Sequence, residues 1–141
     1  MDDQLSDAIE SGDVATVRQI VSEHPAVVNS PEWTPPPLHC AVLWNQPRVA
    51  ELLLQFGADI EMRDPDRKTT PLRYAILYNK PELIRLLVER GANTGVLPGA
   101  DTTAMELAQA AAAGQYEAYD DLPGKAAYCN VVKLLEELGL E

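Results

Sequence analysis

The chain repeats one phrase of its own sequence after 34 residues. The segment PPPLHCAVLWNQ (residues 35–46) returns as TTPLRYAILYNK (residues 69–80), with leucine, alanine and asparagine at matching places. Leu38 and Leu72, for example, stand 34 positions apart. A fixed period of about 20 to 50 residues is typical of proteins that stack copies of one small unit. This period therefore predicts a repeat protein.

Each copy carries the start and stop signals of two short helices. In the second copy, Thr70 is a good N-cap and Pro71 a good first helical residue. This helix is expected to run to about Tyr78, because Asn79 suits the left-handed conformation that ends a helix. Pro81 then opens a second helix with leucines along one face. Two such short helices cannot bury their apolar faces alone, so the copies are expected to stack.

The motifs at the ends of these helices resemble those of the ankyrin repeat. TPLRYA (residues 70–75) and PPLHCA (36–41) resemble its TPLHxA motif, which opens the first helix. FGADIE (56–61) and RGANTG (90–95) resemble its GADxN motif, which closes the second. The Trp, Leu-Gly and Tyr spacing of the tetratricopeptide repeat, the main competitor at this period, is missing. The resemblance implies an all-α ankyrin-repeat solenoid of stacked helix–turn–helix units with short hairpin connections.

Weaker copies at both ends extend the resemblance over nearly the whole chain. Leu5 aligns with Leu38 near the start, and VVKLLEELG (residues 131–139) repeats LIRLLVERG (83–91) near the end. We therefore expect a single ankyrin-repeat domain over residues 1–141. Its four repeats are expected at roughly 1–33, 34–67, 68–100 and 101–141.

The last repeat carries an insertion of about 15 residues, at about 115–129, judged by the repeat period. The surrounding sequence is rich in alanine, glutamate, leucine and glutamine, which are good helix formers. We expect lengthened helices joined by a turn near Pro123 and Gly124. The alternatives are an irregular loop of the same length or a helix break at Gly114, since glycine destabilises a helix interior.

The net charge is −11, from 11 basic and 22 acidic residues. This balance argues against binding to nucleic acid or to an anionic membrane, and it favours a basic partner. The alternative interpretation is a charged surface that only keeps the protein soluble. The start of the chain lacks an apolar signal segment, and no apolar run approaches the ~18 residues of a membrane span. A cytoplasmic protein is therefore expected.

The residues that most often carry chemistry are few. His39 stands at the histidine position of the ankyrin motif, where the resemblance implies a structural role within and between repeats. His24 falls in a turn, and Cys40 and Cys129 are expected to be reduced core thiols. No metal-ligand spacing or phosphate loop is present. We expect no catalysis, no metal and no cofactor.

The ankyrin resemblance implies a partner-binding groove, built from the hairpin tips and the exposed side of the first helices. On this sequence it maps to Trp33, Pro35, Leu43, Trp44, Arg67, Thr69, Leu77 and Tyr78. Tryptophan, tyrosine and arginine dominate the binding energy of many interfaces, which favours a partner site here. The alternative is that the two tryptophans pack on each other and on neighbouring hairpins.

The insertion supplies a second, acidic candidate surface. Its residues are Tyr116, Tyr119, Asp120 and Asp121. The alternative is a helical extension that only covers the end of the stack.

Three positions depart from the ankyrin pattern. Pro36 replaces the threonine whose hydroxyl bonds the motif histidine, and Arg73 and Glu106 replace that histidine in later repeats. We expect the row of hydrogen bonds between repeats to be broken at these positions, with lower stability than an idealised stack.

The resemblance implies a protein–protein interaction module that binds a partner protein through its groove. The alternative is a structural, self-associating unit that forms a homodimer through the aromatic residues of this groove. A monomer is expected in the first case, and the partner's identity does not follow from the sequence.

Overall fold

The computed structural model describes residues 2–30, 36–65, 68–95, 102–115 and 122–140. These residues form helices and their connections, without a β-strand in the described ranges. The expected all-α repeat fold of an ankyrin solenoid is confirmed. Contacts divide the chain into two compact units, Met1–Pro71 and Leu72–Glu141.

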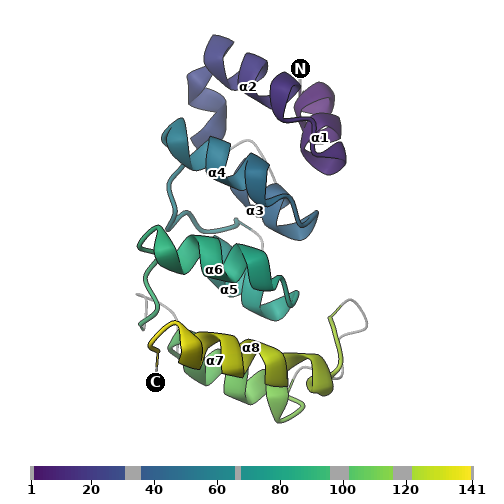
Figure 1. Cartoon of the computed structure of the whole chain (residues 1–141). Helices are drawn as coiled ribbons and strands as arrows, with labels where there is room; N and C mark the ends of the chain where they lie inside the picture. The colour runs from purple at the N-terminus through teal and green to yellow at the C-terminus, as the bar shows by residue number, and fades with distance from the viewer. Residues whose placement is uncertain (1, 31–35, 66–67, 96–101, 116–121, 141) are drawn as a thin grey trace. The chain divides into compact units, whose positions relative to one another are not determined.

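The first unit contains two successive helix pairs, α1–α2 and α3–α4 (Figure 1). The first helices of the pairs, α1 and α3, pack on each other, and so do the second helices, α2 and α4. A short 3-10 helix, η1, follows α2 and packs against α2 and α3. The elements are α1 Asp2–Ser11, α2 Val14–Glu23, η1 Pro25–Asn29, α3 Pro37–Leu43 and α4 Pro47–Gln55.

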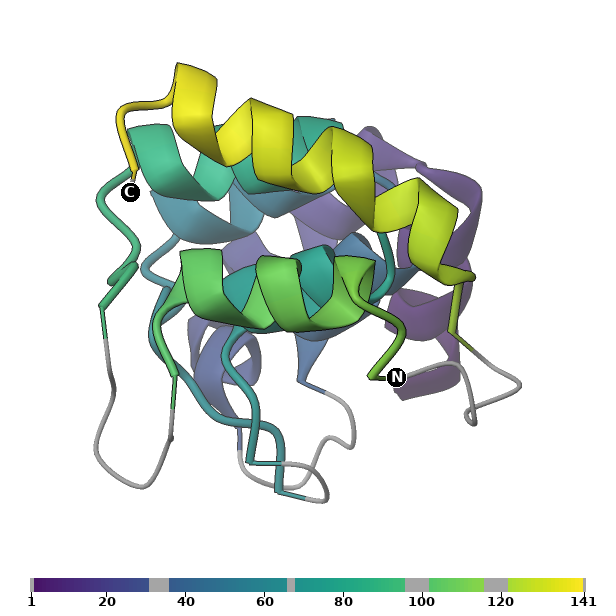
Figure 2. The same cartoon turned by 90° about the horizontal axis from the view of Figure 1, so that it is seen from below.

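The second unit repeats this arrangement with the next two pairs, α5–α6 and α7–α8. Helices α7 and α8 lie side by side (Figure 2), and α8 also contacts α6. Their bounds are α5 Pro71–Leu77, α6 Pro81–Glu89, α7 Ala104–Ala112 and α8 Lys125–Glu137. Helix α5 begins at the last residue of the first unit and otherwise belongs to the second.

A buried residue at the same place in each first helix forms the centre of the core. Leu5, Leu38, Leu72 and Met105 occupy this place in α1, α3, α5 and α7, and each is at most 4% exposed. Complete burial of a leucine or methionine side chain contributes about 2 kcal/mol. The period of the sequence is therefore the period at which the chain places apolar side chains in its core.

The first helices end in the left-handed backbone conformation that their sequences predict. Asn45 and Asn79 have φ angles of 54° and 55°, and Gly12 stands at the equivalent place with φ of 76°. The Gln46 side chain lies against this turn, with Oε1 2.6 Å from the position that a Cβ atom on Gly12 would take. The ends of α1 and α3 are thus held close together.

Long-range hydrogen bonds stabilise the turns of the first unit. His39 Nε2 donates to the carbonyl of Thr69, 2.6 Å away, just before the start of α5. Asn29 makes two bonds to the turn after α4: its Nδ2 donates to the Gly57 carbonyl, and its Oδ1 accepts from the Asp59 N–H. These bonds satisfy main-chain groups where a turn leaves them without helical partners.

The expectation that the row of bonds breaks at Arg73 is wrong. Arg73 donates from one nitrogen to the Thr102 carbonyl at 2.8 Å and from the other to the Thr102 hydroxyl at 2.9 Å. Thr102 stands before α7 as Thr69 stands before α5, so Arg73 takes over the task of His39. The physical reason is that a guanidinium presents several donors on a long side chain and can reach the same acceptor.

Glu106 in α7 acts differently from both. Its carboxylate accepts from the Thr103 N–H, while the Thr103 hydroxyl accepts from the Glu106 N–H. This reciprocal pair is a capping box, which satisfies two main-chain donors at the start of α7.

The insertion lengthens α8 and leaves a break after α7. Helix α8 has 13 residues, compared with 9 in α6. Helix α7 ends at Ala112, and Gly114 has a φ of 93°, so the alternative of a break at Gly114 is confirmed. The turn expected at Gly124 immediately precedes α8, so residues 125–129 of the expected insertion are helical. The division of the chain into four repeats of one domain remains a prediction.

We predict that Arg73→Ala lowers the free energy of unfolding by about 2 kcal/mol, because it removes two charge-assisted bonds to the partly buried Thr102. Arg85→Ala is the matched control, since Arg85 is half exposed and lies 3.8 Å from the exposed Glu137 carboxylate. That change should cost at most about 1 kcal/mol. Urea denaturation of both variants measures the difference. Equal losses would contradict the role assigned to Arg73.

Candidate functional site

The structure describes part of the predicted partner site. Leu43, Trp44 and Thr69 belong to the first unit, and Leu77 and Tyr78 belong to the second. The other predicted residues lie outside the described ranges: Trp33, Pro35, Arg67, Tyr116, Tyr119, Asp120 and Asp121.

Trp44 is the large apolar side chain that the described residues leave exposed, at 48%. It caps the C-terminus of α3, where its N–H donates to the Cys40 carbonyl at 2.9 Å. Leu38, Ala41 and Val42 occupy the buried face of the same helix. The 48% exposure of Trp44 thus begins where this buried face of α3 ends.

Leu43 and Thr69 are half-buried in the same unit. Leu43 precedes Trp44 at the end of α3 and adds apolar surface beside it. The Thr69 carbonyl accepts the His39 bond, so at least the main chain of this residue has a structural task.

Leu77 and Tyr78 already have partners inside the second unit. The Tyr78 ring packs on Tyr74 with centroids 4.9 Å apart and planes tilted by 56°. The Leu77 carbonyl accepts a hydrogen bond from the Tyr128 hydroxyl. Tyr128 is 1% exposed and comes from the first turn of the lengthened α8. Sequence reasoning missed Tyr128, because the repeat pattern has no counterpart for residues of an insertion.

The comparison with known families agrees with this architecture. Residues 5–97 match a family model described as ankyrin repeats in three copies. The chain belongs to the ankyrin-repeat family. The pair α7–α8 lies beyond the matched residues. No curated protein matches the chain.

Ankyrin repeats are generally protein–protein interaction modules, and the family is typically non-catalytic. The described residues contain no group of three or more acidic, histidine or cysteine side chains that could hold a metal ion. None of the helices within the described ranges is long and apolar enough to cross a membrane.

Two open hollows occur within the units of this ankyrin-repeat protein. One, of about 420 Å³, lies at α1 and α2 and is lined by Gln4, Asp7, Ala8, Ser11, Asp13 and Thr16. The other, of about 380 Å³, lies at α7 and α8 and is lined by Gln109, Ala112, Cys129, Val132, Lys133 and Glu136. Cys129 is exposed, so the expectation of a core thiol is wrong for this residue. Neither hollow is lined by a histidine, so the Cys129 thiol has no imidazole base in its own hollow.

The surroundings of His39 and Cys40 in α3 explain why both are poor catalytic groups. Burial lowers the pKa of His39, although its bond to Thr69 and the nearby Asp64 carboxylate oppose the shift. Burial, followed by the charge of Asp64, raises the pKa of Cys40 to about 11. At neutral pH the imidazole is therefore neutral and the thiol protonated. A protonated thiol is a weak nucleophile.

We predict that His39 makes the stability of the protein depend on pH. Because burial lowers its pKa below the usual 6.5, the unfolded chain binds this proton more readily than the folded one. The free energy of unfolding should therefore fall as the pH drops below about 6.5 and toward the folded-state pKa.

His39→Gln keeps a nitrogen donor and removes the titration. Denaturant unfolding at about pH 7 and pH 5 measures the free energy of unfolding of the native chain and the variant. This range lies above the ordinary carboxylate pKa values. The variant should lose less stability over this interval than the native chain. The same loss in both would contradict the assignment.

Proposed function

We propose that this ankyrin-repeat protein binds a partner protein through the exposed end of α3, centred on Trp44. The observation that carries the proposal is the 48% exposure of this tryptophan. The other large apolar side chains of the described residues are covered to a greater extent, so the exposure is local. A large apolar side chain that the fold leaves in water gains free energy when a partner covers it.

Tryptophan is suited to this task because of its size and rigidity. Burying one aromatic side chain removes about 150 to 250 Å² from water, and an indole can also donate a hydrogen bond. Such residues often account for about 2 kcal/mol or more of the binding energy at an interface. Leu43, half-buried beside Trp44, extends the apolar contact.

The remaining predicted residues have a secondary place in the proposal. Leu77 and Tyr78 are half-buried and have internal contacts, so they offer less free surface than Trp44. Trp33, Pro35 and Arg67 remain predicted contacts of the groove, and the acidic surface of the insertion remains a prediction as well. The proposal assigns binding rather than catalysis to the protein.

A second copy of the chain is the alternative occupant of the same surface. An exposed indole can pack against a second copy of the chain as well as against another protein. Sedimentation at micromolar concentration distinguishes the two: a dimer that Trp44→Ala dissociates would replace the proposed function by a homodimer.

We predict that Trp44→Ala abolishes capture of a partner from a lysate of the source organism without unfolding the protein. Removing one central hot-spot residue should weaken binding by about thirtyfold or more. Leu140→Ala is the control, because it shortens a half-buried side chain in the other unit. Circular dichroism confirms that both variants are folded. A partner captured equally by all three proteins would contradict the site at Trp44.

A further inference from the structure

We infer that the surface around Trp44 binds a basic segment, with a lysine or arginine side chain of the partner placed between the indole and Glu10. The inference rests on the proposed function and adds the chemistry of the partner. Its basis is the contact that brings the last turn of α1 against the turn that carries Trp44.

A side-chain bond joins these two turns. Gln46, two residues after Trp44, donates from Nε2 to the Glu10 carbonyl at 3.0 Å. The end of the Gln46 side chain also lies beside Gly12, with Oε1 2.6 Å from the position that a Cβ atom there would take. Helices α1 and α3 also pack along their lengths. The main chain of Glu10, whose side chain is exposed, is therefore tied to the chain segment that adjoins the exposed tryptophan.

The charges along α1 are all of one sign. The first 17 residues hold five acidic residues and no lysine or arginine. Asp7 is exposed one turn before Glu10, and Asp13 is exposed three residues after it. The Thr16 hydroxyl, which donates to Asp13, is the main cause of a lowered pKa for that carboxyl, so Asp13 is ionised at neutral pH. The apolar surface at Trp44 thus borders a negatively charged helix.

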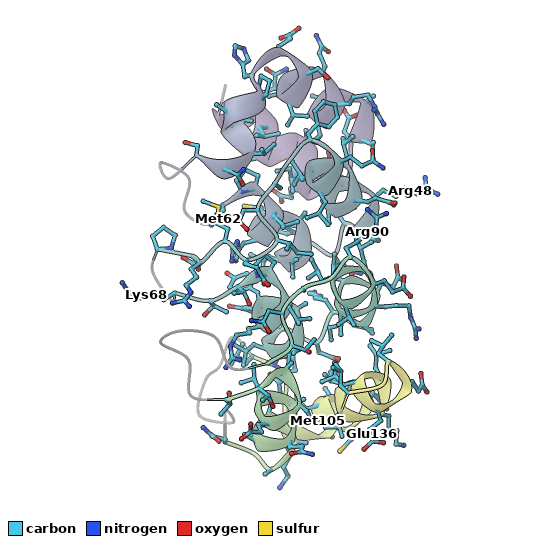
Figure 3. The ribbon with its side chains drawn as sticks, turned by 90° about the vertical axis from the view of Figure 1, so that its left-hand side faces the viewer. Arg48, Met62, Lys68, Arg90, Met105 and Glu136 are labelled. Atoms are coloured by element: carbon cyan, nitrogen blue, oxygen red, sulfur yellow. The ribbon has the colours of Figure 1, made fainter. Side chains whose placement is uncertain are left out.

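The helix ends add to this negative charge. The C-terminus of an α-helix carries a partial charge of about −0.5, which a basic residue in the last turn often offsets. Neither α1 nor α3 has a basic residue in its last turn. Arg48, which Figure 3 labels, is exposed in the first turn of α4 rather than in the last turn of α1 or α3. The C-termini of α1 and α3 therefore favour a cation that the partner supplies.

An indole beside a carboxylate is well suited to a long basic side chain. The face of a tryptophan attracts cations more strongly than that of tyrosine or phenylalanine. The methylene stem of a lysine or arginine packs on the ring, while its charged group reaches the carboxylate. Opposite charges also speed the encounter of two proteins and select against acidic competitors. An acidic or purely apolar partner would leave Glu10 without compensation.

Fluorescence anisotropy with labelled octapeptides tests the inference. The probe alternates leucine with arginine, and matched peptides carry serine or glutamate in place of arginine. The native protein should bind the arginine peptide about tenfold more tightly than the glutamate peptide, with the difference shrinking at high salt. Glu10→Gln should weaken binding of the arginine peptide about threefold. Glu23→Gln, which neutralises an exposed acid at the end of α2, should leave it unchanged.

The other outcomes distinguish a failure of this inference from a failure of the proposed function. If the serine and arginine peptides bind equally and both need Trp44, the partner site stands and the basic partner is wrong. If Glu10→Gln has no effect, or if Trp44→Ala leaves the arginine peptide bound, the inference is overturned. A native protein that binds none of the peptides also overturns it, while capture of a partner by the Trp44 surface still decides the proposed function. A Trp44-dependent dimer would overturn it in favour of a second copy.

Discussion

The turns before α5 and α7 each present a main-chain carbonyl to a side chain of the preceding first helix, and that carbonyl must be satisfied. His39 does so for Thr69 and Arg73 does so for Thr102. A carbonyl left without a partner in a buried turn costs about 1 to 3 kcal/mol, so these bonds hold the start of each following helix in place. The buried leucines of the repeat can pack only when that start is fixed. The rest of each unit therefore depends on one bond that two different side chains can make.

Because His39 must reach this carbonyl, one side of α3 has a structural role, while another side faces solvent. His39 and Trp44 are five positions apart, which places them about 140° apart around a helix. The histidine is fully buried and donates to the Thr69 carbonyl, whereas the tryptophan side is left to solvent. A repeat unit can therefore change its outward residues without disturbing its stacking. This freedom explains how a tryptophan is tolerated at the end of α3.

The equivalent ends of α3 and α5 have different surroundings, and at α5 the insertion supplies them. In the second unit, the first turn of α8 carries Tyr128, which is buried and donates its hydroxyl to the Leu77 carbonyl at the end of α5. The neighbouring Tyr78 ring packs on Tyr74. In the first unit, α3 ends at an exposed tryptophan, and its turn is tied by Gln46 to the acidic α1. The two equivalent helix ends thus have different surfaces, one covered by aromatic contacts and one open.

The sequence by itself determined the repeat, the helix pairs and their ends. Proline, asparagine and glycine act through backbone geometry that is local, so Pro71, Asn79 and Gly91 were placed correctly from the pattern alone. The place of Trp44 in the repeat predicted a partner site there, but left open whether the side chain is exposed, which the fold decides. Only the tertiary structure decided the contacts that a pattern of residue types does not encode. Arg73 could replace His39 because its reach, rather than its identity, matches the acceptor, and Tyr128 comes from an insertion with no counterpart in the repeat. The approach of Glu10 to the Trp44 turn depends on a side-chain bond between residues 36 positions apart, and only the packed chain brings such residues together.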